Sequence, residues 1–183
     1  PPEIAALREI DIDPETVARI DAAVAAVRSA PDSASAWLEL GMVYHANSFY
    51  GPAVTSYEQA AALAPDQART HYLLGIGRSR NGDVVGAVSP VATAVALSPA
   101  EPTFLWRLGW LQLEAGDLPA AAKTFDAVLA DDPRSQAALV GRARVALQVG
   151  RPEDAVRDLE AAADVSARNS GYIHQLLASA YQR

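Results

Sequence analysis

Residues 34–67, ASAWLELGMVYHANSFYGPAVTSYEQAAALAPDQ, contain the pattern that decides the fold of this chain. Apolar residues recur there at steps of three and four, in a first set (Trp37, Leu40 and Tyr44) and a second set (Val54, Tyr57 and Ala61). This spacing places side chains on one face of an α-helix, and the pattern breaks between the two sets. The stretch therefore predicts two antiparallel helices that pack against each other.

The same pattern recurs with a period of 34 residues. Four sets keep this spacing: prolines at 31, 65, 99 and 133, glycines at 41, 75 and 109, glycines at 82, 116 and 150, and alanines at 53, 87, 121 and 155. A fixed period of this length is typical of an array of stacked repeats. We expect repeats at 34–67, 68–101, 102–135 and 136–169. An N-terminal segment with a capping helix at about 14–29 occupies 1–33, and a helix resembling the first half of a fifth repeat occupies 170–183.

Each recurring residue has a physical role. The glycines at 82, 116 and 150 supply a left-handed turn after the first helix, and the prolines at 65, 99 and 133 stop the second. The glycines at 41, 75 and 109 and the recurring alanines let two helices approach closely. Three positions depart from the repeat pattern. Pro90 kinks its helix or forces a restart at Ser89, and Asn47 takes the left-handed conformation in the first repeat. Arg142 replaces a leucine in a degenerate fourth repeat, which we still expect to form two helices.

The stretch from Trp37 to Tyr44 resembles the tetratricopeptide repeat family, because WLELGMVY matches its W-x2-L-G-x2-Y opening. Ala121, Phe125 and Pro133 match the A-x3-F segment and the closing proline of the same family. The resemblance implies an all-α, right-handed superhelical solenoid of antiparallel helix pairs that acts as an interaction scaffold. The lysine and asparagine clamp of the chaperone-binding members is absent, since Leu38 and Met42 occupy matching positions, so a carboxylate-clamp co-chaperone is disfavoured.

Composition excludes several classes of function. The 183 residues include no cysteine, which excludes a thiol nucleophile, a disulfide and a thiolate metal site. A net charge of −7 argues against nucleic acid as a partner. No apolar run approaches the roughly 20 residues of a membrane span, and no signal pattern is present, so we expect a soluble chain, with the cytoplasm favoured. His45, His71 and His174 lack the spacing of a metal pair, and we expect no metal, no cofactor and no catalytic residue.

The resemblance places the first helix of each repeat on the inner face of the solenoid. The inward positions that we expect to form a peptide-binding groove are Leu38, Met42, Arg69, Tyr72, Ile76, Arg80, Trp106, Trp110, Val140 and Arg144. Six of the 14 arginines (at 69, 78, 80, 107, 142 and 144) lie on first helices, which predicts a locally basic groove. Trp106 and Trp110 are either interface anchors or core residues packed against the adjacent repeat.

The leading hypothesis is a non-catalytic scaffold that binds an apolar, partly acidic peptide or helix in this groove. Two alternatives remain: a regulatory or substrate-recruiting segment of a larger enzyme, and a self-assembly module that forms a homo-oligomer through its terminal repeats. We expect the natural protein to continue past Arg183, or the last helix to meet another chain. Residues 2–13 mix apolar and acidic side chains, so they either act as a stand-in ligand for the groove or form a loose terminus or local cap.

Overall fold

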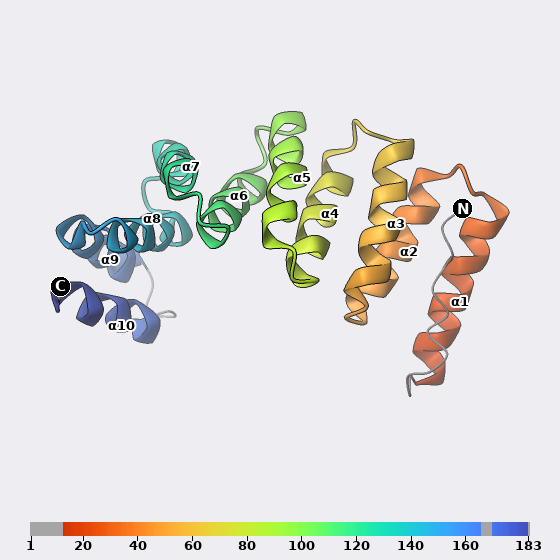
Figure 1. The fold of residues 1–183 in the computed structure, drawn as a ribbon, viewed down its shortest axis with the longest axis horizontal. Coiled ribbons are helices and arrows are strands. Elements are labelled where there is room, and N and C mark those ends of the chain that lie inside the picture. Colours follow the sequence, from red (N-terminus) through yellow and green to blue (C-terminus); the bar gives the residue numbers. More distant parts are fainter. Residues whose placement is uncertain (1–12, 166–169, 183) are drawn as a thin grey trace. The chain divides into compact units, whose positions relative to one another are not determined.

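The computed structural model describes residues 13–165 and 170–182, and within these ranges it contains ten helices and no strand (Figure 1). The helices are α1 (Pro14–Ser29), α2 (Ala34–Ala46), α3 (Tyr50–Leu63), α4 (Ala68–Arg80), α5 (Val84–Leu97), α6 (Pro102–Glu114), α7 (Leu118–Asp131), α8 (Gln136–Gln148), α9 (Pro152–Val165) and α10 (Ser170–Tyr181). The possible role of residues 2–13 as a ligand lies almost wholly outside the described residues.

The chain divides into two compact units, unit 1 (Pro1–Ser98) and unit 2 (Pro99–Arg183). In unit 1, each helix from α1 to α5 packs on the next one in sequence. In unit 2, the helices α6 to α10 pack in the same sequential manner, and α6 also contacts α8. Short turns join the neighbouring helices from α1 to α5 in unit 1 and from α6 to α9 in unit 2, which makes these consecutive helices antiparallel. The prediction of an all-α fold of antiparallel helix pairs is confirmed within each unit.

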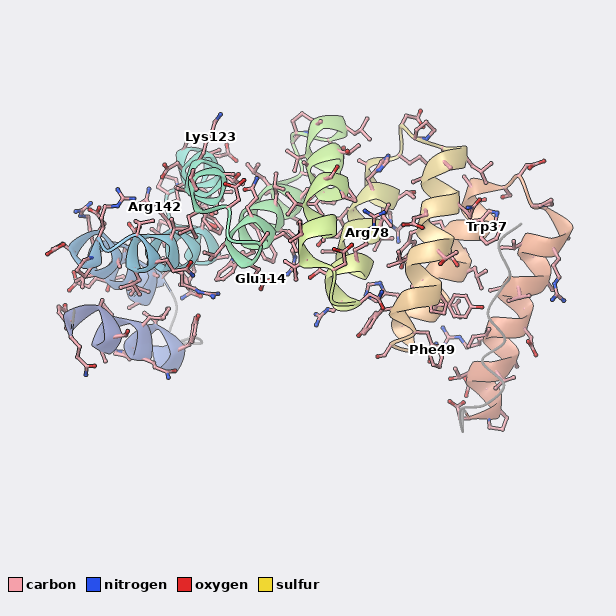
Figure 2. The ribbon with its side chains drawn as sticks, viewed as in Figure 1. Trp37, Phe49, Arg78, Glu114, Lys123 and Arg142 are labelled. Carbon is pink, nitrogen blue, oxygen red and sulfur yellow. The ribbon has the colours of Figure 1, made fainter. Side chains whose placement is uncertain are left out.

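Each unit has its own hydrophobic core. The core of unit 1 includes Trp37, Leu40, Tyr44 and Tyr57, and Trp37 also donates its indole N–H to the carbonyl of Pro31 at 2.8 Å (Figure 2). The core of unit 2 is centred on Phe125, Leu159 and Ile173, which are fully buried. Burial of such side chains is the main stabilising term for helix pairs of this kind.

Close helix contact explains the small recurring residues. A Cβ atom added to Gly41 would lie 2.5 Å from the ring of Tyr57, and one added to Gly109 would lie 2.7 Å from the ring of Phe125. Real Cβ atoms do not approach aromatic carbons this closely, so any larger residue would push the second helix away. The prediction that positions 41 and 109 must be small is confirmed.

The four turns after α2, α4, α6 and α8 share one geometry. In each, the residue two positions past the helix has a positive φ: 64° at Ser48, 91° at Gly82, 84° at Gly116 and 74° at Gly150. The next amide then donates to a carbonyl five residues back, as from Phe49 to Tyr44 at 2.9 Å and from Asp83 to Arg78 at 2.9 Å. The left-handed turn predicted for the three glycines is confirmed.

The prediction for Asn47 is wrong. Its φ is −100°, and its side-chain amide donates to the carbonyl of Val43 at 2.8 Å, which holds it as a helix-capping residue. Ser48 takes the left-handed conformation instead. Because Ser48 lies 34 residues before Gly82, the repeat register itself assigns the turn to position 48.

Helix α5 continues through Pro90 without a restart. It begins at Val84, where the carboxylate of Asp83 accepts from the amide of Gly86 at 2.8 Å, so the alternative of a new start at Ser89 is wrong. Pro90 has no N–H to give to the carbonyl of Gly86, four residues earlier. That carbonyl instead accepts from Nη1 of Arg78 on α4 at 3.0 Å. A side chain from the neighbouring helix therefore replaces the hydrogen bond that the proline removes.

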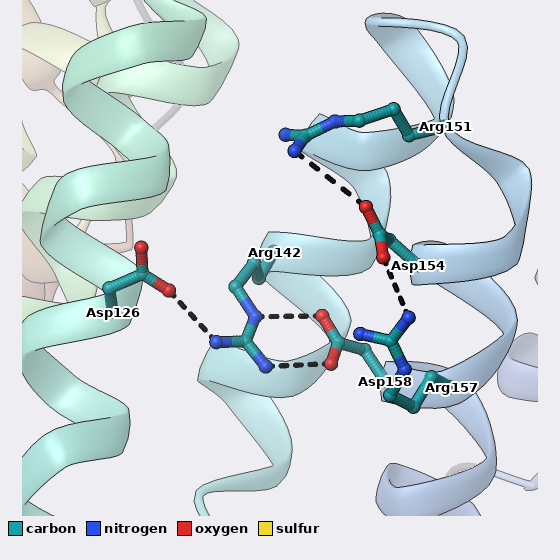
Figure 3. Close-up of polar contacts among 6 residues, drawn as sticks. All are labelled: Asp126, Arg142, Arg151, Asp154, Arg157 and Asp158. Atoms are coloured by element: carbon teal, nitrogen blue, oxygen red, sulfur yellow. Dashed lines mark hydrogen bonds and ion pairs between the residues drawn. The ribbon is translucent and has the colours of Figure 1, made fainter.

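An ion cluster replaces the leucine of the fourth repeat, which forms both of its expected helices, α8 and α9 (Figure 3). Arg142 on α8 donates from Nε and Nη2 to the two carboxylate oxygens of Asp158 on α9, both at 2.7 Å, and from Nη1 to Asp126 on α7 at 2.8 Å. These hydrogen bonds, those with Asp158 above all, raise the pKa of Arg142 above its usual range. The cluster ties three helices of unit 2 together with a geometry that apolar packing alone would not impose.

Candidate binding surface

The ten residues predicted to line a groove come from the first helix of each pair. Leu38 and Met42 lie on α2; Arg69, Tyr72, Ile76 and Arg80 lie on α4; Trp106 and Trp110 lie on α6; and Val140 and Arg144 lie on α8. Six of them belong to unit 1 and four to unit 2. The two sets are described separately below as the first-helix surface of each unit.

In unit 2 two tryptophans form the centre of this surface. Trp106 and Trp110 are both half-buried and pack against the core of unit 2. The ring of Trp110 meets that of Phe125 edge to face, with centroids 5.9 Å apart. Each tryptophan therefore packs against the core while it remains partly exposed.

Arginines cover both indole rings. The guanidinium carbon of Arg107 lies 4.5 Å from the ring centroid of Trp106, and that of Arg144 lies 5.0 Å from that of Trp110. Cation–π contacts of this kind contribute about 0.5–2 kcal/mol. The second contact joins α8 to α6. Arg107 was not among the ten predicted groove residues, although it was one of the six first-helix arginines that predicted a basic groove.

Val140 does not belong to the exposed part of this surface. Its side chain is 7% exposed and lies in the core of unit 2. Helix α8 packs against α6, α7 and α9, so neighbours bury more of its surface than the single face that the sequence analysis assigned to the core. Val140 can support the tryptophan-bearing face from below but cannot contact a ligand.

In unit 1 the same surface is formed by α2 and α4. Leu38 and Met42 are half-buried against the core of unit 1, Tyr72 and Ile76 are also half-buried, and Arg69 and Arg80 are exposed. Arg69 donates from Nη2 to the sulfur of Met42 at 3.5 Å, which joins α4 to α2. Of the six residues predicted in unit 1, the structure brings Met42 and Arg69 into direct contact.

A histidine–tyrosine pair joins α2 to α3 in unit 1. The hydroxyl of Tyr57 on α3 lies 3.4 Å from Nδ1 of His45 on α2. Burial raises the pKa of Tyr57 to about 12, so the hydroxyl keeps its proton. Burial, reinforced by the charge of Arg80, lowers the pKa of His45, so the ring is neutral at pH 7. The sequence alone does not indicate that His45 pairs with a residue on the second helix.

Charge differs sharply between first and second helices. The first helices α2, α4, α6 and α8 contain six arginines and two glutamates, a net charge of +4, whereas the second helices α3, α5, α7 and α9 contain two cations and eight carboxylates, a net charge of −6. In each unit the first helices therefore carry more positive charge than the second helices.

Two of the six arginines do not contribute to a free basic surface, which corrects the expectation from sequence. Arg78 pairs with Glu58 on α3 at 2.7 Å, and Arg142 pairs with Asp126 and Asp158. Arg69, Arg80, Arg107 and Arg144 remain, and none of these four forms an ion pair with another described residue. Each unit thus has two arginines on its first helices that form no ion pair with another described residue.

Within residues 13–165 and 170–182, no group of three or more histidine, aspartate or glutamate side chains could hold a metal ion. None of the helices described is both long enough and apolar enough to span a membrane.

Comparison with known proteins shows a partial family match and a shared fold. Residues 106–172 match the sequence model of the tetratricopeptide repeat family. Among solved structures, the chain is similar to YrrB (TM-score 0.80, 21% identity, 92% of this chain and 84% of that one) and to MamA (TM-score 0.77, 18% identity, 86% of each). It is also similar to a tetratricopeptide repeat protein from Parabacteroides merdae (TM-score 0.80, 18% identity, 91% of this chain and 66% of that one). No curated protein matches the sequence. Residues 106–172 thus match a tetratricopeptide repeat model, and the chain shares the fold of these solved structures.

Proposed function

We propose that this protein is a non-catalytic interaction scaffold that binds an apolar, partly acidic peptide or helix on its first helices. The observation that carries the proposal is the group formed by Trp106, Trp110, Arg107 and Arg144, in which each of two half-buried indoles lies against a guanidinium that has no carboxylate partner among the described residues. The structure of YrrB is described as having an unusual peptide-binding site, which supports a similar use of this fold. Leu38, Met42, Arg69, Tyr72, Ile76 and Arg80 form the corresponding proposed surface of unit 1.

The chemistry of the tryptophan group favours a mixed ligand. Tryptophan and arginine are among the residue types most enriched at interface hot spots, since an indole buries a large area and a guanidinium presents five N–H donors. A guanidinium stacked on an indole keeps its N–H groups at the ring's edge, where they can donate to a carboxylate while the exposed indole contacts an aliphatic side chain. An acidic amphipathic segment provides both contacts.

A display selection tests this function. A library of random 16-residue peptides is selected against the wild-type protein and against an Arg107→Gln, Arg144→Gln variant. We expect wild-type binders to be enriched in both Asp or Glu and large apolar residues, and binders of the variant to lose the acidic enrichment. Arg134→Gln with Arg151→Gln, which removes two exposed charges outside α6 and α8, is the matched control. Selection of basic peptides, or unchanged acidic enrichment in the variant, would contradict the proposal.

Self-association is a second candidate, because the last helix leaves aromatic surface uncovered. Tyr172 and Tyr181 on α10 are 46% and 67% exposed, and Leu176 and Leu177 are only half-buried. We propose that this face supports contact between copies at high concentration. Light scattering across a 100-fold range of protein concentration tests it, with Tyr172→Glu as the variant that should lower the mass. A constant monomer mass in the wild type would exclude this candidate.

A further inference from the structure

The five residues Met42, His45, Tyr57, Arg69 and Arg80 form a cluster in unit 1, here called the His45 cluster. Tyr57 reaches His45 at 3.4 Å, and Arg69 reaches Met42 at 3.5 Å. The ring of Tyr57 is held in place because Gly41 and Gly77 leave room for it on both sides. Helices α2, α3 and α4 therefore bring these side chains together from three separate stretches of sequence.

The cluster is rich in hydrogen-bond donors and cations, and no described acidic side chain pairs with it. Arg69 and Arg80 are exposed and form no ion pair with any other described residue. Tyr57 is fully buried, so a ligand can reach only the half-buried His45 ring of this pair; in the tautomer whose Nδ1 accepts from the Tyr57 hydroxyl, the Nε2–H is the donor that remains. The charge of Arg80 acts on His45 and that of Arg69 acts on Tyr57, so both guanidiniums lie within electrostatic reach of the pair.

From this arrangement we propose that the His45 cluster is an anion-binding subsite that takes side-chain carboxylates from an acidic segment of a protein partner. The inference deepens the proposed function, since it assigns the acidic contacts of unit 1. It nevertheless uses none of the residues of the tryptophan group in unit 2.

Spacing distinguishes side-chain carboxylates from a compact anion. Arg69 and Arg80 are eleven residues apart on one helix, which separates their Cα atoms by about 16 Å along its axis. A single phosphate suits convergent donors around one point, whereas two cations this far apart on one helix suit a chain with several carboxylates. The sulfur and methylenes of Met42 add an apolar contact for the aliphatic part of a glutamate side chain.

Proton NMR of the histidine rings tests the subsite directly. The chain has three histidines, so the His45 ring signals can be assigned by their loss in His45→Gln. The probes are N-acetyl tetraglutamate amide and inorganic phosphate, each titrated at pH 7.5 and constant ionic strength. We expect the tetraglutamate to shift the His45 signals saturably while those of His71 and His174 stay constant, and phosphate to bind at least tenfold more weakly.

Matched variants separate this subsite from general charge effects. Arg69→Gln with Arg80→Gln should weaken the tetraglutamate response at least tenfold, whereas Arg19→Gln with Arg28→Gln, which removes two exposed charges from α1 of the same unit, should change it by less than twofold. The response should survive Arg107→Gln with Arg144→Gln, so a failure of the tryptophan surface is distinguishable from a failure here. Absence of a His45 response, an equal response in the Arg69 and Arg80 variant, or tighter binding of phosphate would overturn the proposal.

Discussion

Arg78 replaces the hydrogen bond to the carbonyl of Gly86 that Pro90 cannot donate, and the effect of removing it can be worked out from the structure. Arg78→Met keeps the aliphatic stem but leaves the carbonyl of Gly86 without a donor. A hydrogen bond from a charged group contributes about 1.5–3 kcal/mol, and the partly exposed pair with Glu58 adds up to about 1 kcal/mol. We therefore expect Arg78→Met to lower the free energy of unfolding of unit 1 by about 2–4 kcal/mol.

The same substitution should matter much less once residue 90 has an amide. In Pro90→Ala the new N–H donates to Gly86, so Arg78→Met removes chiefly the ion pair with Glu58 and costs about 1 kcal/mol. The coupling free energy between positions 78 and 90 is then about 1.5 kcal/mol or more. Glu58→Gln is the matched control, because it removes the ion pair alone and should cost about 1 kcal/mol or less with either residue at 90.

Trp37 fluorescence during urea unfolding provides the measurement. Trp37 is the one tryptophan of unit 1, so the four proteins of the cycle are made with Trp106→Phe and Trp110→Phe, which silences unit 2. This choice avoids treating a chain of two units as a single two-state system. If Arg78→Met costs the same in both backgrounds to within about 0.5 kcal/mol, the idea that Arg78 replaces the missing hydrogen bond is refuted.

Four further predictions concern single sites. Ser48→Gly should stabilise unit 1 by about 1 kcal/mol, because it removes the strain of a side chain in the left-handed conformation. Gly116→Ala should destabilise unit 2 by a similar amount for the opposite reason. Urea midpoints that move the opposite way would contradict this. Arg142→Leu should lower the free energy of unfolding by about 3 kcal/mol, because it leaves the carboxylate of Asp158, a residue only 5% exposed, without a partner. Thr124 occupies the position of Asp158 one repeat earlier. Adding Asp158→Thr should therefore recover most of that loss in thermal melts. Trp110→Ala should cost about 3 kcal/mol and more than Trp106→Ala, since Trp110 contacts the buried ring of Phe125; equal melting temperatures would show that this contact adds no stability. The pKa of His45 is lowered in the folded state, so its contribution to stability is present above its unfolded pKa of about 6.5 and is lost as the pH falls below that value. The urea midpoint should therefore drop more between pH 7.5 and 5.5 in the wild type than in His45→Gln.

The repeat period by itself determined much of the local structure. The four first helices begin at residues 34, 68, 102 and 136, and the positive-φ residues at 48, 82, 116 and 150 keep the same spacing of 34. Helix bounds and turns depend on short-range features such as a left-handed residue, a proline or an apolar face, and these recur wherever the sequence does. The left-handed conformation was assigned to Asn47 because asparagine often adopts it. The 34-residue spacing instead places the turn at Ser48.

Tertiary structure alone decided what the arginines do. All six on the first helices look equivalent in sequence, yet Arg78 and Arg142 are used within the fold, and Arg107 and Arg144 lie on tryptophan rings. The partner of each depends on residues up to 34 positions away on another helix, and a periodic pattern does not indicate which long side chain reaches which acceptor. Val140 was misplaced for a related reason: the burial of a helix face depends on how many neighbours surround the helix, which only the packed structure determines.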